Sequence, residues 1–288
     1  MYFAPKNKAM KQWLLAVIIS VGAVLCVHVY FFQVHLVQGA SMEPEFVQGD
    51  LMLVDVRAWE IKQIARNDEL IVQQSSPSVR QLKRVIGMPG DTIKVIDYQV
   101  KPKDVEHCKL PYLVKTTTEL MPWEAYGIHA ATKVTSDNDW LLGLTDKQYK
   151  ALRKKEIVRF ITKAPALYLE SMPFVEQIPG WTGANFGKLV VPGKQRVLKI
   201  SRSNFPLYLD MVKQEGKMHI DTIIQAVNNG KTIHYQPQFD YYFVMGDNRF
   251  ASVDSRSYGF ICQTDVIGKV KTKLFGSSRI KQSQPLRE

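Results

Sequence analysis

The stretch Gln81–Asp91 reads QLKRVIGMPGD and predicts the type of secondary structure that dominates this chain. Apolar and polar residues alternate over Gln81–Ile86, as they do in a β-strand. Met88–Asp91 is expected to turn, because proline presets φ and glycine supplies a positive φ. A second strand is expected over Thr92–Val100, so the stretch predicts a strand, a turn and a strand.

The same pattern recurs on both sides of that stretch. Gln33–Val56 alternates short apolar runs with glycine and proline, which again predicts a strand, a turn and a strand. We therefore expect a mainly β fold with an antiparallel β-sheet core. Further strands are expected at Asp68–Val72, Tyr241–Met245, Tyr258–Ile261 and Val266–Leu274.

A long segment of mixed character separates the two β-rich parts. Helices are expected at Thr118–Tyr126, at Thr145–Phe160 and at Phe205–Glu215, which glycine follows. Asn229-Gly230 between two apolar runs predicts a type I′ hairpin. The predicted organisation is a core in two halves, 33–97 and 237–275, with a large mixed α/β insertion at 98–236 and a flexible tail at 276–288.

The N-terminal region predicts a membrane anchor. From Trp13 to Phe32 the sequence WLLAVIISVGAVLCVHVYFF has no Asp, Glu, Lys or Arg. At about 1.5 Å per residue, a helix of this length crosses the hydrocarbon core of a bilayer. We expect a cytoplasmic tail at 1–11 and a single-pass transmembrane helix at 12–32, since lysines precede it without acidic residues. A cleaved secretory signal is the alternative, but it usually has a shorter apolar core.

The overall charge and the cysteines exclude some classes of function. The net charge of +11 favours contact with anionic lipids of the cytoplasmic membrane, and an exported domain has no nucleic acid to bind. The histidines and cysteines lack metal-binding spacing, so no metal is expected. A disulfide between Cys108 and Cys262 is conceivable in an oxidising compartment but is not predicted.

The first candidate site is the turn Gly39-Ala40-Ser41-Met42-Glu43-Pro44. A serine among small residues can present its hydroxyl and its backbone N–H to a substrate, although most serines in such turns are structural. Nine residues from Phe32 span at most roughly 30 Å, which places Ser41 near the membrane surface.

The second candidate is Lys83, in the strand predicted over Gln81–Ile86. A lysine acts as a base only if its pKa falls towards neutrality, and burial among apolar side chains has that effect. Leu82, Met42 and Phe46 could provide such surroundings. A surface lysine on an edge strand is the alternative interpretation.

The third candidate is Phe243–Arg256, which reads FVMGDNRFASVDSR. Its polar half would ordinarily be a solvated loop. However, Asp254 is placed to pair with Arg256, and Asp247 could pair with Arg84, so charge-assisted hydrogen bonds could hold it.

The motifs S-M-x-P, K-R-V-I-G-M-P-G-D and G-D-N-x-x-x-S-x-D-S-R follow one N-terminal apolar segment. In that order they resemble the motifs of bacterial type I signal peptidases, the leader peptidases of serine peptidase family S26. The resemblance covers about residues 12–97 and 240–275. Phe186–Pro192 and the length of the insertion are similar to Gram-negative, Bacteroidetes-like members.

The resemblance implies an endopeptidase that cleaves signal peptides from exported preproteins, without a cofactor, at the outer face of the bacterial cytoplasmic membrane. Ser41 would be the nucleophile and Lys83 the general base, and Ser252 would orient Lys83. Met42 and Leu82 would line a pocket for small side chains. The residues that would support the site are Arg84, Gly246, Asp247, Asn248, Asp254 and Arg256.

Three residues depart from the family pattern, namely Gly39, Glu45 and Gln81, and they raise the prospect of an altered preference. Two other classes of protein remain open as alternatives. One is a self-cleaving repressor-type peptidase, which the anchor disfavours. The other is a non-catalytic scaffolding or binding domain, in which the serine or the lysine is typically lost.

Overall fold

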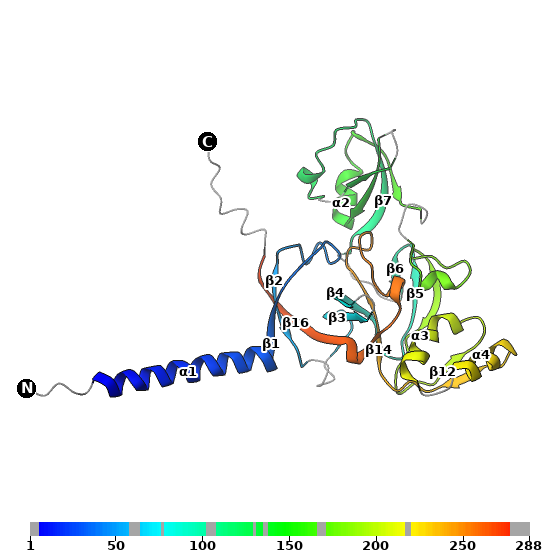
Figure 1. Cartoon of the computed structure of the whole chain (residues 1–288). Helices are drawn as coiled ribbons and strands as arrows, with labels where there is room; N and C mark the ends of the chain where they lie inside the picture. The colour runs from blue at the N-terminus through cyan, green and yellow to red at the C-terminus, as the bar shows by residue number, and fades with distance from the viewer. Residues whose placement is uncertain are drawn as a thin grey trace, which may run out of the picture.

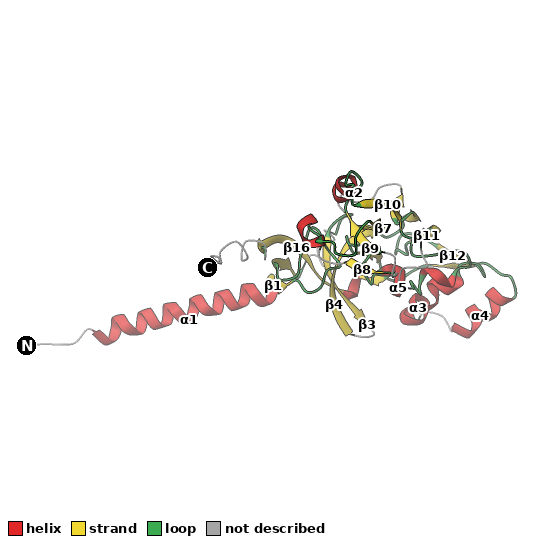
Figure 2. Ribbon diagram, turned by 90° about the horizontal axis from the view of Figure 1, so that it is seen from above, coloured by secondary structure: helices red, strands yellow, loops and turns green. Residues whose placement is uncertain are grey.

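The computed structural model describes residues 6–57, 64–75, 78–101, 108–128, 131–134, 138–165, 171–216 and 220–276. Helix α1 (Lys6–Tyr30) projects away from a body of β-sheets, as Figures 1 and 2 show from two directions. It occupies the segment for which the sequence predicts a transmembrane helix. Among the described residues, however, no helix meets the length and hydropathy that crossing a bilayer requires. The anchor at 12–32 therefore stays a prediction.

A seven-stranded antiparallel sheet forms the core, which confirms the mainly β prediction. Its strand order is β1-β2-β16-β3-β4-β14-β15, so strands from both ends of the chain alternate within one sheet. The strands predicted at Asp68–Val72, Tyr241–Met245 and Val266–Leu274 are confirmed. The strands are β1 (Phe32–Leu36), β2 (Leu51–Asp55), β3 (Glu69–Ser75), β4 (Ser78–Gly87), β14 (Tyr241–Met245), β15 (Ile261–Cys262) and β16 (Val266–Phe275).

The stretch after the Met88–Asp91 turn is a hairpin rather than the single strand predicted over Thr92–Val100. Strand β5 (Thr92–Ile96) turns at Asp97 and Tyr98, both with positive φ, into β6 (Gln99–Lys101). On its other side β5 pairs with β11 (Phe186–Val190), which comes from the middle of the chain. Strands β12 (Leu198–Ile200) and β13 (Ile233–Tyr235) form a separate two-stranded antiparallel sheet.

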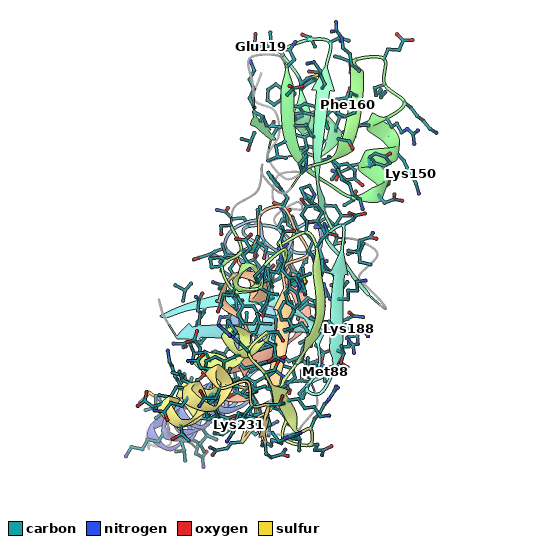
Figure 3. All side chains as sticks on the ribbon, turned by 90° about the vertical axis from the view of Figure 1, so that its right-hand side faces the viewer. Met88, Glu119, Lys150, Phe160, Lys188 and Lys231 are labelled. Atoms are coloured by element: carbon teal, nitrogen blue, oxygen red, sulfur yellow. The ribbon has the colours of Figure 1, made fainter. Side chains whose placement is uncertain are left out.

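A separate four-stranded unit stands above the core in Figure 1, and Figure 3 shows Phe160 and Lys150 within it. The predicted helix Thr145–Phe160 is wrong in its second half. Thr145 caps a short helix, and the chain then pairs as a strand with β7. The elements are β7 (Leu110–Thr116), β8 (Ala131–Lys133), β9 (Asp139–Leu144), α2 (Asp146–Leu152) and β10 (Val158–Lys163).

Two further predictions in the insertion are wrong. Only the 3₁₀ turn η1 (Trp123–Tyr126) forms within the predicted helix Thr118–Tyr126. Asn229-Gly230 is not a hairpin, because it ends helix α4 (Ile220–Asn228). The apolar residues of α4 recur at helical spacing and bury Ile223 and Val227 against the core.

Helix α3 (Phe205–Glu215) confirms the prediction for that segment, with Gly216 in the left-handed region at its end. The strand predicted at Tyr258–Ile261 is wrong, because helix α5 (Ser255–Tyr258) forms first and only β15 follows it. Short 3₁₀ turns η3 (Val175–Gln177) and η4 (Gln263–Asp265) complete the described elements. Cys108 and Cys262 are both buried, and no disulfide joins them.

Candidate active site

Ser41 lies in the loop between β1 and β2, which backbone hydrogen bonds close on both sides. The Val37 N–H donates to the Asp50 carbonyl at 2.8 Å, and the Gly49 N–H donates back to Val37 at 3.0 Å. Met42 and Phe46 then point inward and pack in one apolar cluster with Leu82. The loop is thus anchored at its base and beneath Ser41, which itself stays half-buried.

Lys83 lies in the interior of the sheet and not on an edge. Strand β4 is paired with β3 on one side and β14 on the other, and Lys83 faces Leu70 in the register. The lysine is only 3% exposed. Burial lowers its pKa from 10.5 to about 8, although the charge of Asp254 partly opposes that change. Lys83 is therefore buried, and the alternative of a surface lysine on an edge strand is wrong.

The loop that follows β14 holds the backbone of Ser41. The Asn248 N–H donates to the Ser41 carbonyl at 3.0 Å, and its side-chain amide donates to the Ala40 carbonyl at 3.1 Å. Gly246, in the same loop, packs directly against the Ser41 carbonyl and Ser252. A Cβ at that position would collide with the Ser41 carbonyl oxygen and with Ser252 Oγ, so only glycine fits between them.

The Asp254–Arg256 pair is fully buried and fixes the loop from within. Arg256 donates to both oxygens of Asp254 at 2.9 Å, and the Gly246 N–H donates to the same carboxylate at 3.1 Å. Burial alone would raise the pKa of Asp254, but Arg256, the charge of Lys83 and the Gly246 N–H together outweigh burial, and the pKa is lowered. The local pairing expected from the sequence is confirmed.

The Arg84–Asp247 pair joins β4 to the same loop, as the sequence predicts. Two parallel hydrogen bonds of 2.7 and 2.6 Å connect the guanidinium to the carboxylate. Arg84 also donates to Glu69 and, at 3.0 Å, to Glu45. Glu45, which departs from the family pattern, is therefore a partner of Arg84.

Three polar groups at the site have no hydrogen-bond partner within the described part of the chain. They are the Ser41 backbone N–H, the buried hydroxyl of Ser252 and the Lys83 ammonium. The Ser252 hydroxyl is buried, and buried polar groups are nearly always paired in native proteins, so this exception calls for an explanation. A carbonyl oxygen would suit the N–H, and a buried hydroxyl is a suitable neighbour for an amine.

A pocket of about 690 Å³ opens on this site and is lined by both Ser41 and Lys83. Leu82 lines it as well, whereas Met42 is buried beneath the loop and is not among the lining residues. Gly39, with φ of 78°, and Gln81 also line the pocket. Two of the three departures from the family pattern thus face the space beside Ser41.

Sequence reasoning missed two residues that support the site. Arg249 is fully buried and donates to the Gly246 carbonyl at 3.1 Å and to the Tyr98 carbonyl at 2.8 Å. Lys109 forms a buried ion pair of 2.6 Å with Glu43. Arg249 follows Gly246-Asp247-Asn248 directly, which was a usable signal. Lys109 is far away in the sequence and offered none.

Comparison with known proteins places these features in a family. The profile described as "Signal peptidase, peptidase S26" matches residues 10–163 and 192–275. Signal peptidase I of Bacillus licheniformis is 31% identical over 134 residues, which cover 46% of this chain and 67% of the relative. Signal peptidase I of Aquifex aeolicus is 24% identical over 261 residues, covering 90% and 82%. That of Buchnera aphidicola is 22% identical over 273 residues, covering 91% and 73%.

Proposed function

The chain belongs to the signal peptidase family, peptidase S26, and from that premise we propose how its residues perform the family's reaction. Members of this family are serine endopeptidases that remove signal peptides from preproteins, and this chain is such an enzyme. Ser41 is proposed as the nucleophile and Lys83 as its general base. The shared pocket of the two residues is the observation that carries the assignment.

The proposed reaction proceeds in two steps. Ser41 Oγ attacks the carbonyl carbon of the residue that ends the signal peptide, and Lys83 Nζ accepts the hydroxyl proton and passes it to the leaving amine. Water then hydrolyses the acyl-enzyme with Lys83 again acting as base. The partnerless N–H of Ser41 is suited to bind the developing oxyanion, where a preorganised donor is worth about 10²–10³ in rate.

The burial of Lys83 supports its role as base. With a pKa of about 8, roughly a tenth of the lysine side chains are neutral at pH 7, against far fewer for a lysine at 10.5. Ser252 is proposed to orient Lys83 through a hydrogen bond that the described residues do not show, since its buried hydroxyl has no other partner among them. The loops around the site are proposed to be held in place by Arg84, Asp247, Asn248, Asp254 and Arg256.

The pocket beside Ser41 is proposed to accept the small side chains that precede the cleavage site. Leu82 supplies an apolar wall, and Met42 supports the loop from below. Gln81 is the polar addition to this pocket. We therefore expect a preference for small residues that tolerates a polar side chain next to Gln81.

We further propose that α1 anchors the enzyme in the cytoplasmic membrane, with the catalytic part on the extracytoplasmic side. Large apolar side chains along the helix are exposed, with Trp13 at 74% and Val24 at 68%. An apolar surface of this extent on a single helix is unusual unless something covers it. Lipid is the partner proposed here. Alkaline extraction of membranes should leave the full chain in the pellet and release a variant that lacks residues 1–32.

A cleavage assay tests the catalytic assignment. The full chain in mild detergent should cut a preprotein once, and mass spectrometry of the new N-terminus should locate the cut. Ser41→Ala and Lys83→Ala should each abolish cleavage, whereas Ser203→Ala and Lys94→Ala, at exposed positions, should not. Cleavage by either of the first two variants would refute the dyad. A wild type that cleaves no preprotein would favour the scaffolding alternative.

A further inference from the structure

A second and larger cavity lies on the other side of the Ser41 loop. It is a groove of about 1300 Å³, larger than the roughly 300–1,000 Å³ typical of small-molecule pockets. In this loop, residues up to Ser41 line the first pocket, and Glu43, Pro44, Glu45 and Val47 line the groove. The two cavities therefore flank one short loop, with the proposed nucleophile between them.

The opposite wall of the groove comes from the four-stranded unit. Helix α2 lies on the side of that unit nearest the core in Figure 1 and contributes Lys147, Gln148 and Ala151. The turn η1 contributes Ala125 and Tyr126. Neither the core nor this unit forms the groove alone, so the insertion has a defined place beside the site.

The direction of a bound substrate follows from the chain around Ser41. The first pocket is lined by Val34, His35 and Leu36 of β1 and by the residues after them, and β1 begins just after α1 ends. The signal peptide, held in the bilayer, must approach Ser41 from that end. A polypeptide continues through the site, so its mature part must leave at the other end, where the groove begins.

The charges in the groove suit a peptide backbone. Five of the six charged residues of its lining are in ion pairs: Glu43 with Lys109, Glu45 with Arg84, Asp146 with Lys150 and Lys163 with Asp97, and Lys147 is the sixth. Leu110, Tyr112 and Leu152 supply apolar surface. Paired charges around an apolar and amide lining favour an uncharged, extended segment over a polyanion or a lipid headgroup.

The floor of the groove is joined to the catalytic loops. Lys109 pairs with Glu43, two residues from Ser41, and its backbone donates to the Asp247 carbonyl and accepts from the Arg249 N–H. Contact with a peptide in the groove is therefore made on the same framework that holds Ser41. Binding energy gained there can position the scissile bond.

We infer that this groove binds the first residues of the mature part of the preprotein, in an extended conformation. The inference rests on the proposed function. It assigns the insertion a role in binding the substrate residues that follow the scissile bond. The pocket at Leu82 and Gln81, in contrast, is proposed to bind the residues that precede that bond.

Two peptides that share one signal region test the inference. One ends about two residues after the cut and the other about ten residues after it. Wild type should cleave the long peptide with a kcat/KM about tenfold higher, as expected for a few well-packed contacts. Ala151→Trp and Ala125→Trp, each filling the groove from an exposed position, should remove that advantage and leave the short peptide unaffected.

Lys154→Trp, just beyond α2 and outside the groove lining, is the matched control and should keep the advantage of the long peptide. Equal cleavage of both peptides by wild type would overturn the inference while leaving the proposed function intact. An equal loss on both peptides for the groove variants would also overturn it. If neither peptide were cleaved by wild type, the proposed function itself would fail.

Discussion

Lys83 should reduce the stability of the folded protein, and replacing it by methionine should therefore stabilise the protein. The side chain is buried in the sheet, and its pKa falls from 10.5 unfolded to about 8 folded. Each pH unit of such a change corresponds to about 1.4 kcal/mol, so the cost of the buried charge is about 3 kcal/mol at pH 7. Methionine has a similar length and no charge, so Lys83→Met should raise the free energy of unfolding by about that amount.

The pH dependence of stability tests the sign of this free-energy change a second time. Between pH 8 and 10.5 the unfolded chain holds a proton on Lys83 that the folded chain has lost, so wild-type stability rises through this window. Below pH 8 the lysine is charged in both states and the cost is fully present. The advantage of Lys83→Met should therefore shrink from about 3 kcal/mol at pH 7 to under about 1 kcal/mol at pH 10.

Chemical denaturation of the full chain in mild detergent measures both quantities. The exposed Lys94 in β5 is the control, since Lys94→Met removes the same charge without relieving burial and should change stability little at either pH. The methionine variant should also be inactive, so stability and activity would move in opposite directions. A variant less stable than wild type at pH 7, or a gain that does not change with pH, would refute the reasoning.

Three further predictions concern activity. With Lys83 as base, kcat/KM should fall about tenfold per pH unit below about pH 8, and a flat profile between pH 6 and 8 would contradict this. Gly246→Ala should displace the Ser41 carbonyl and Ser252. Activity should fall at least about 100-fold, and the free energy of unfolding should fall by about 1–3 kcal/mol. Near-normal turnover would show that the two loops can move apart to accommodate the methyl group. Ser252→Ala should lower kcat with little change in KM. The thermal midpoint should also change little, because the hydroxyl has no partner to lose within the described residues. An unchanged kcat would show that Ser252 does not orient Lys83.

Features that depend on neighbouring residues were predicted well from the sequence. The turn at Met88–Asp91 forms with Gly90 at φ of 84° and with the Asp91 N–H donating to the Met88 carbonyl. Helix α3 ends at Gly216, as its sequence indicates. In both cases the decisive residues lie within a few positions of one another.

Features that depend on distant partners were predicted less well. The residues after α2 form β10 because β7 lies alongside them, and nothing local to Val158–Lys163 reveals that neighbour. Lys83 could equally have been an edge residue until β14 was seen to pair with β4. At the site, opposite charges suggested the Arg84–Asp247 pair across 163 positions, whereas the partner of Glu43 could not be identified.

The buried charges around Lys83 explain why so many polar residues surround a site with one proposed base. Asp254 is near enough to influence the pKa of Lys83, and a direct ion pair between them would keep the lysine protonated. Both Asp254 oxygens are instead occupied by Arg256, and one also by the Gly246 N–H. Asp247 is held by Arg84 in the same way. Residues that look like structural supports therefore also keep carboxylates away from Lys83, and their loss should act on the chemistry as well as on the fold.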